Sequence, residues 1–264
     1  MKTLATAFAE AKAQNRAALI GYLPAGFPSR DEAPELISAM VAGGADIVEV
    51  GMPYSDPVMD GPAIQGAAEI ALRGGATMQD VLAGVRAAAS AGAAACVMSY
   101  WNPIEKYGPS RLAADLAQAG GTGAITPDLS PQEAASWMES TDAQGIGRVF
   151  LVAPSSTDER LAMVTAASSG FVYAASLMGV TGNAEANGDT ARTLLERTRT
   201  HTALPIAVGL GVSTPEQAKV IAQFADGVIV GSAFVRAVTA AGSHAQACEA
   251  VTELAAKLRE GVTR

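Results

Sequence analysis

Short apolar runs alternate with longer, alanine-rich segments along the whole chain. The eight apolar runs have the length of strands, and the segments between them carry apolar residues at helical spacing. Strand followed by helix, repeated eight times, is typical of a closed parallel barrel, and we therefore predict a (β/α)8 TIM barrel. The predicted strands are 17–22, 47–50, 95–100, 123–126, 148–152, 171–176, 205–208 and 228–230.

Local start signals position several helices. Ser130 and Thr214 are each followed by a proline and then by an acid or amide, the signature of a capped helix N-terminus. Leu4 and Phe8, one helical turn apart, predict an extra N-terminal helix. A short extra helix is predicted after the last strand, at 233–238. An open, doubly wound sheet is the alternative architecture, since the pattern does not show closure. The main helices are predicted at 31–42, 62–90, 109–119, 131–139, 157–168, 188–199, 214–223 and 244–260.

Composition limits the kind of protein. The 264 residues are 49% hydrophobic and 17% charged, which suits one domain, 1–264, with one core. A net charge of -8 opposes binding to nucleic acid, because no stripe of Lys and Arg is available for phosphates. No run of about twenty apolar residues predicts a membrane span. The two cysteines have no metal-ligand spacing and predict a reducing, cytoplasmic location.

The most informative segment places two carboxylates close together. Glu49 lies within the apolar run 45–51, and Asp60 follows eleven positions later, after a turn that contains Pro53 and Pro57. Burial on a strand enclosed on both faces raises the pKa of a carboxyl toward neutrality, which suits Glu49 to proton transfer. Two carboxylates in unlike surroundings indicate divided catalytic roles.

Each carboxylate also has a structural interpretation. Glu49 is also explained as a buried structural residue, held by an arginine or by backbone donors. Asp60 precedes Gly61 and Pro62, as a helix cap or turn former does. Only the pair favours the catalytic interpretation.

Three glycine-containing segments follow consecutive strands and predict a phosphate site on one rim of the barrel. Each offers unhindered backbone amides, and Gly231 and Ser232 open the short final helix, where free N–H groups favour an anion. Taken singly, each glycine is explained by a turn. The segment 179–188 has the composition of a lid over a ligand, and a plain mobile loop explains it equally. The three segments are 179–182, 209–213 and 231–232.

Missing residues exclude other chemistry. The histidines, His201 and His244, lie away from the predicted strand ends, and no lysine lies on a predicted strand. Histidine catalysis, a histidine-rich metal site and Schiff-base lyase chemistry are therefore poorly supported, which leaves acid/base catalysis by carboxylates without a metal. Five apolar or aromatic residues suit a pocket for a flat apolar group, and equally an ordinary core: Tyr22, Met98, Ile125, Tyr173 and Leu210.

The segment VEVGMPYSDPVMDGPAIQ, residues 48–65, strongly resembles the signature of the tryptophan synthase α subunit family. This resemblance implies a TIM barrel that cleaves indole-3-glycerol phosphate to indole and glyceraldehyde 3-phosphate in tryptophan biosynthesis. It also implies a β-subunit partner that holds pyridoxal phosphate and receives the indole in an α2β2 complex, with no cofactor in this chain. Further family motifs follow in the same order: LIGYLPAGFP at 19–28, SYWNPI at 99–104, ITPDLSPQE at 125–133, SLMGVTG at 176–182, VGLGVSTPEQ at 208–217 and VIVGSAFV at 228–235.

The resemblance implies a role for each matching residue. Glu49 would protonate carbon 3 of the indole and then, once ionised, remove a hydroxyl proton from the glyceryl chain. Asp60 would stay anionic and accept the indole N–H, while Tyr173 positions Glu49. Thr181 belongs to the loop that orders Asp60 on closure. The residues matching the phosphate site are Gly182, Gly211, Gly231 and Ser232.

The resemblance also implies where the partner binds. The loop 54–60 matches the region that meets the β subunit, with Asp56 and Pro57 near the contact, and Asn102 lies in a second interface region. Leu177 stands where some members of the family carry Arg. This departure puts in doubt any loop contact made by that Arg, but not the pair of carboxylates.

Three alternatives remain from the sequence. Another phosphate-binding barrel of the pathway, an indole-glycerol-phosphate synthase or a phosphoribosylanthranilate isomerase, is not expected to carry the motif from Glu49 to Asp60, and a catalytic lysine for the synthase is absent from the strand ends. A self-sufficient lyase would turn over rapidly without a partner. A silent regulatory subunit would bind a phosphorylated ligand without cleaving it, which the intact carboxylates oppose.

Overall fold

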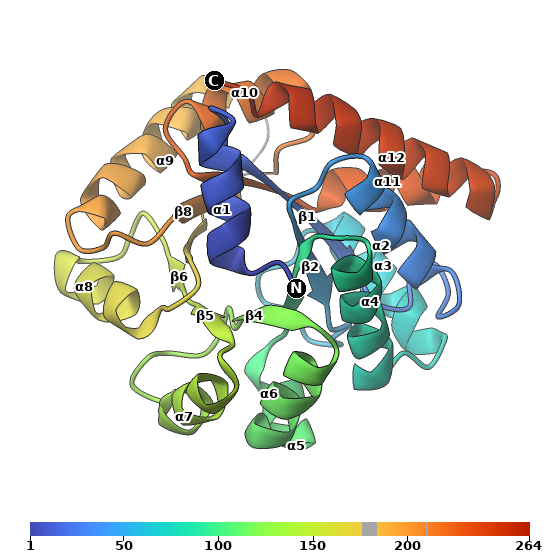
Figure 1. Ribbon diagram of the computed structural model, residues 1–264, viewed down its shortest axis with the longest axis horizontal. Coiled ribbons are helices and arrows are strands. Elements are labelled where there is room, and N and C mark those ends of the chain that lie inside the picture. Colours follow the sequence, from blue (N-terminus) through green and yellow to red (C-terminus); the bar gives the residue numbers. More distant parts are fainter. Residues whose placement is uncertain (176–183, 210) are drawn as a thin grey trace.

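The computed structural model describes residues 1–175, 184–209 and 211–264, in which nine parallel strands are surrounded by helices (Figure 1). The strands are hydrogen-bonded in the order β5-β4-β3-β2-β1-β9-β8-β7-β6. Their bounds are β1 Ala18–Pro24, β2 Ile47–Gly51, β3 Ala94–Met98, β4 Gly121–Ile125, β5 Gly147–Val149, β6 Leu151–Val152, β7 Val172–Ala175, β8 Ile206–Gly209 and β9 Gly227–Val230.

The strand order shows that the sheet curves into a barrel. β5 and β6 stand at opposite ends of the order, yet only Phe150 separates them in the chain. Nine strands about 4.8 Å apart would span roughly 40 Å in a flat sheet, which no single residue bridges. The two ends therefore meet at one segment. The TIM barrel prediction is confirmed and the open sheet is excluded; the predicted strand 148–152 is interrupted at Phe150 and counts as two.

The helices form a ring outside the strands, with α1 across one end of the barrel (Figure 1). The extra N-terminal and final short helices are confirmed as α1 and α11. None of the helices in the described part of the chain has the length and apolar character that a membrane crossing requires. Their bounds are α1 Leu4–Ala13, α2 Ala33–Ala42, α3 Pro62–Arg73, α4 Met78–Ser90, α5 Trp101–Tyr107, α6 Pro109–Gln118, α7 Ala135–Gln144, α8 Asp158–Ala167, α9 Ala184–Arg199, α10 Pro215–Ala222, α11 Ser232–Ala240 and α12 His244–Gly261.

One long predicted helix is two helices in the structure. The predicted segment 62–90 breaks after α3, where Gly75 has a φ of +78. Thr77 then starts α4 with a capping box: its hydroxyl accepts the Gln79 N–H at 3.3 Å, and the Asp80 carboxylate accepts the Thr77 N–H at 2.8 Å. Both signals are present in the sequence, so the break was predictable from local chemistry.

One further helix was predicted to start too early, and one helix was missed. The helix predicted at 131–139 begins only at Ala135, because the Ser130 hydroxyl donates to Glu133 within a turn and caps nothing. The helix α5 was not predicted at all. The backbone N–H of Trp101, at its start, donates at 2.8 Å to the carboxylate of Asp128, which lies in another loop. By contrast, Thr214 caps α10 as predicted, accepting from the Gln217 N–H at 3.3 Å.

Helix α1 fills the end of the barrel at which the strands begin. Leu4 and Phe8 lie in a cluster with inward-facing residues such as Phe171. The strands make room for them with glycines: a Cβ on Gly123 would lie 2.7 Å from Leu4 Cδ1, and one on Gly227 would lie 3.0 Å from Phe8 Cε1. With α1 across this end, we place the ligand site at the carboxyl ends of the strands, as in other barrels of this kind.

A buried ion pair fixes β2 beside β1. Asp46, which the sequence analysis did not single out within the apolar run, is buried with Arg16. The guanidinium donates twice to the carboxylate, at 2.5 and 2.7 Å, and the Leu19 N–H donates to it at 2.9 Å. The pair therefore anchors the start of the strand that carries Glu49.

We predict that Asp46→Ala destabilises the protein by about 3 kcal/mol or more, because it leaves the Arg16 guanidinium buried and unpaired. Urea unfolding monitored by circular dichroism measures the change. The matched control is Glu69→Gln, which breaks an exposed pair with Arg73 and should cost less than about 1 kcal/mol. Equal effects of the two substitutions would contradict a special role for the buried pair.

Candidate active site

Glu49 points into the barrel from the middle of β2. Its strand neighbours are Tyr22 on β1 and Cys96 on β3. Ile47 packs in the inner cluster beneath α1, and side chains two residues apart share a face, so Glu49 lies above Ile47. Only 2% of Glu49 is exposed, and its Oε1 atom has no hydrogen-bond partner among the residues that the structure describes. An arginine or backbone donor holding this oxygen, the structural interpretation of Glu49, is therefore not observed.

Burial raises the pKa of Glu49 to about 8. The carboxyl group is thus protonated at neutral pH, because ionisation would place an uncompensated charge among apolar groups. A group with this pKa can both give and take a proton near neutrality.

Two tyrosines face the same part of the interior. Burial, followed by the charges of Asp60 and Glu49, raises the pKa of Tyr22 well above its ordinary value. Burial, followed by Glu49 and Asp60, does the same to Tyr173 on β7. The same two charges act on both hydroxyls, so the structure brings together two carboxylates and two phenols from separate elements.

Glycines make room for both tyrosine rings. A Cβ on Gly51 would lie 2.3 Å from the Tyr22 hydroxyl oxygen, and one on Gly209 would lie 2.4 Å from that of Tyr173. Each ring therefore lies over a glycine of the neighbouring strand. The width of the site depends on these small residues as well as on the large ones.

Asp60 lies half-buried in the loop between β2 and α3. Burial raises the pKa of Asp60 above its ordinary value, and a hydrogen bond with the Tyr100 hydroxyl offsets part of that rise. The N-cap of α3 is Gly61 without any side-chain cap bond, so Asp60 is not the helix cap that its sequence context suggested. Tyr100 was missed by the sequence analysis, although a polar residue directly after a barrel strand is a signal for this rim.

The other predicted pocket residues lie at varied depth. Ile125 is fully buried in the inner cluster, and Met98 packs against that cluster while remaining partly exposed. Leu210, Thr181, Gly182 and Leu177 lie outside the described residues. The lid predicted at 179–188 is tested only in part, since residues from Ala184 onward belong to α9.

The predicted phosphate rim combines two described segments. Gly231 is the N-cap of α11 and makes no side-chain cap bond, and Gly211 has a φ of +68, which favours glycine. Arg236 on α11 donates to the Ser213 hydroxyl at 2.7 Å, which in turn donates to the Gly211 carbonyl at 3.1 Å. The sequence analysis considered only loop residues and missed this arginine.

The loop that carries Asp60 continues to the outer surface. The rings of Tyr54 and Tyr100 lie 5.2 Å apart, and the Asn102 amide donates to the Tyr54 hydroxyl at 3.3 Å. Beside them Val58 is 77% exposed and Met59 41% exposed. Adjacent exposed apolar side chains of this kind are one mark of a surface that binds a partner.

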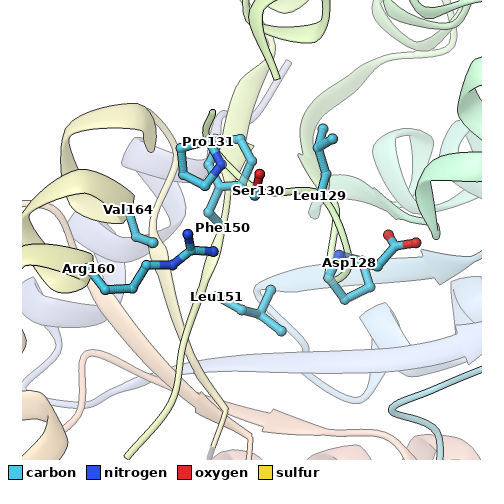
Figure 2. A pocket seen from close by; sticks show the side chains of 9 residues that line it. Asp128, Leu129, Ser130, Pro131, Phe150, Leu151, Arg160 and Val164 are labelled. Atoms are coloured by element: carbon cyan, nitrogen blue, oxygen red, sulfur yellow. The ribbon is translucent and has the colours of Figure 1, made fainter. Parts of the chain in front are cut away.

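A separate pocket lies on the rim between the ends of β4 and β6 (Figure 2). Arg160 and Asp128 stand on opposite sides of it in the figure. Its volume of about 100 Å³ is below that of typical ligand sites, roughly 300–1,000 Å³, and Glu49 is not part of it. We therefore do not assign the substrate to it. Its lining residues are Pro127, Asp128, Leu129, Ser130, Pro131, Phe150, Leu151, Arg160 and Val164.

Comparison with known families agrees with this arrangement. The family model described as tryptophan synthase alpha chain matches residues 8–263. The chain belongs to the tryptophan synthase alpha chain family. The resemblance inferred from the sequence is thereby confirmed, as is the assignment to the lyases of tryptophan biosynthesis. The two other barrel families of the pathway are excluded.

Relatives in the tryptophan synthase alpha chain family match along their whole length. The protein from Thermobifida fusca is 60% identical over 265 residues, covering 99% of this chain and 98% of its own. Among solved structures, Mycobacterium tuberculosis tryptophan synthase gives a TM-score of 0.92 at 49% identity, with 100% of both chains covered. The alpha subunit from Legionella pneumophila gives 0.89 at 31% identity, covering 99% of this chain and 98% of its own.

We predict that Glu49→Gln stabilises the protein increasingly as pH rises. In the acid range both the folded and the unfolded wild type are protonated; between the ordinary pKa of 4.5 and about 8 the unfolded chain loses its proton first, so wild-type stability falls. The variant cannot ionise, and its advantage should grow by roughly 5 kcal/mol between pH 4 and pH 9 in urea unfolding. A pH-independent difference would contradict the raised pKa.

Proposed function

We propose that this chain, acting as one barrel domain, cleaves indole-3-glycerol phosphate to indole and glyceraldehyde 3-phosphate, with Glu49 as both acid and base. The observation that carries the proposal is a buried Glu49 oxygen without a partner in the described part of the chain, in a carboxyl group with a pKa of about 8. Tyr22 and Tyr173 face the same region. The family of the chain supports the choice of substrate.

The proposed reaction begins with proton transfer to the indole ring. Protonated Glu49 gives its proton to carbon 3, which makes the ring cationic and able to accept the bonding electrons. The ionised carboxylate then removes the proton of the adjacent glyceryl hydroxyl as the carbon–carbon bond breaks. Indole leaves, the hydroxyl carbon becomes the aldehyde, and Glu49 is protonated again.

Asp60 is proposed to remain anionic and to accept the indole N–H. A fixed negative charge at this point stabilises the positive charge that develops on the ring. Burial leaves the pKa of Asp60 above its ordinary value, and the hydrogen bond with Tyr100 reduces that rise by favouring the ionised form. Tyr173 is proposed to position Glu49 without transferring a proton.

The remaining groups are proposed to bind the substrate. Tyr22, Met98, Ile125 and Leu210 would line the indole pocket, and no metal is needed in this scheme. The start of α11 and the left-handed turn at Gly211 support an anion site, because both present unhindered amides. Thr181 would belong to the closing loop, and the phosphate would be bound by Gly182, Gly211, Gly231 and Ser232.

We further propose a β-subunit partner in an α2β2 complex, with pyridoxal phosphate in that partner and none in this chain. The exposed Val58 and Met59 support a docking surface on the Asp60 loop, together with Asp56, Pro57 and Asn102. A solved relative is described as tryptophan synthase from M. tuberculosis in an aminoacrylate-bound form. A cytoplasmic location remains a prediction from the cysteine usage.

The first functional prediction concerns the two carboxylates. Glu49→Gln should abolish release of indole from indole-3-glycerol phosphate, because the amide neither donates a proton to carbon nor removes one. Asp60→Asn should cost about 3 kcal/mol or more of transition-state stabilisation, equivalent to a loss of more than about 100-fold in kcat/KM.

Glu69→Gln serves as the control for both variants, because Glu69 is an exposed residue of α3 and should leave activity unchanged. The unfolding measurement above establishes that the Glu49 variant is folded. Full activity of Glu49→Gln would refute its role, and a loss below tenfold for Asp60→Asn would refute that of Asp60. A silent regulatory subunit predicts no activity in any variant, including the wild type.

The second functional prediction concerns the partner. Addition of β subunit should raise the turnover of this chain, because docking on the Asp60 loop would favour a closed arrangement. Val58→Asp should weaken activation about tenfold or more in the β-subunit concentration required, by placing a charge in an apolar contact. Val220→Asp on α10 alters a valine that is 49% exposed elsewhere and serves as the control. Equal turnover with and without β subunit would instead favour a self-sufficient lyase.

A further inference from the structure

A cluster of metal-binding side chains lies between α2 and α12, on the outer ring of helices. Glu35 on α2, and His244 and Cys248 on α12, place a carboxylate oxygen, an imidazole nitrogen and a sulfur within 4.8 Å of one another. The His244 Nε2 atom lies 2.7 Å from Glu35 Oε2 and 3.6 Å from Cys248 Sγ. None of these residues has a part in the proposed reaction.

The geometry of the two helices brings these side chains to one place. His244 and Cys248 are separated by one helical turn and therefore lie on the same face of α12. Glu32 and Glu35, one turn apart at the start of α2, face them. The sequence analysis found no metal-ligand spacing because Glu35 and His244 are 209 positions apart in the chain.

The cluster has an excess of negative charge. Two carboxylates and a thiol surround one imidazole. The neighbouring Arg30 is engaged elsewhere, donating to Asp80 at 2.8 Å. Within the described residues, no lysine or arginine forms an ion pair with either glutamate of the cluster. A divalent cation would supply the missing positive charge.

The distances suit zinc. With Zn–N near 2.0 Å and Zn–S near 2.3 Å, a tetrahedral site separates nitrogen and sulfur by about 3.5 Å. The observed separation of His244 Nε2 and Cys248 Sγ is 3.6 Å. The Glu35 oxygen is closer to the imidazole than a tetrahedron requires, and a small rotation of its exposed side chain would open the space for the ion.

The second nitrogen of His244 supports the same conclusion. Its Nδ1 atom is buried and finds no hydrogen-bond partner in residues 1–175, 184–209 and 211–264, and the Glu32 Oε1 atom lies 3.7 Å away. A histidine that binds a metal through one nitrogen commonly donates its other N–H to a carboxylate, which fixes the ring. Glu32, which accepts from the Ser29 hydroxyl at 2.7 Å, is placed to do this.

We propose that this cluster is a Zn²⁺ site, with His244 Nε2, the Cys248 thiolate and Glu35 Oε2 as protein ligands and water in the fourth position. Glu32 orients the imidazole. Binding releases the thiol proton to solvent and joins α2 to α12, which are distant in sequence. The bound ion stabilises the contact between α2 and α12 in the outer ring of helices.

Titration of Zn²⁺ into the full-length, chelator-treated protein tests the proposal by calorimetry. One equivalent should bind, and the melting temperature should rise with Zn²⁺ concentration. His244→Gln, Cys248→Ser and Glu35→Gln should each weaken binding more than about tenfold, and Glu32→Gln about tenfold. His201→Gln, which changes the other histidine, should bind zinc like the wild type.

Cobalt and a thiol reagent give independent measurements. Co²⁺ should produce a thiolate charge-transfer band that Cys248→Ser lacks. Because Cys96 is fully buried, a thiol reagent should modify only Cys248 in the native protein, and Zn²⁺ should slow that reaction. Failure to bind Zn²⁺, or binding that survives all three ligand substitutions, would overturn the proposal. Glu49→Gln should bind zinc normally, which separates this test from that of the active site.

Discussion

The desolvation of one carboxyl group is the constraint on which the active end of this barrel depends. Among the described residues, Glu49 has a buried oxygen without a hydrogen-bond partner. Burying a polar atom in this way costs free energy, so the surrounding structure has to hold the side chain in place. The Arg16–Asp46 pair at the start of the same strand contributes to this, because it fixes β2 where a shift would give Glu49 access to water. Asp46, which stabilises the strand, and Glu49, which is proposed to transfer protons, are thus three residues apart.

The interior is shaped by pairing large side chains with glycines on the next strand. Below, Gly123 and Gly227 admit Leu4 and Phe8 of α1; above, Gly51 and Gly209 admit the rings of Tyr22 and Tyr173. Pairing of large side chains with glycines therefore closes one end of the barrel and shapes the proposed site at the other. Close packing of this kind limits side-chain freedom, and it keeps the orientation of the two phenols fixed relative to Glu49.

Much of the fold and the proposed site was predictable from the sequence, for physical reasons. Strand and helix periodicity identified the barrel, and an acid within an apolar run identified Glu49. Interactions between distant segments were not predictable: α5 depends on Asp128 for its first hydrogen bond, and the cap expected at Ser130 is lost to a local turn. Tyr100 follows a strand closely, but its partner Asp60 comes from another loop, and Arg236 likewise bonds to a residue of another loop, so the local pattern alone gave neither role.

The junction at Phe150 has a consequence for association with other chains. Since β5 pairs only with β4, and β6 only with β7, the unpaired backbone at the junction is limited to strands of three and two residues. A foreign strand finds no edge long enough to extend, so the protein offers little template for amyloid-like growth. For the same reason a specific partner has to recognise side chains on loops, and cannot join this protein by adding a strand to its sheet.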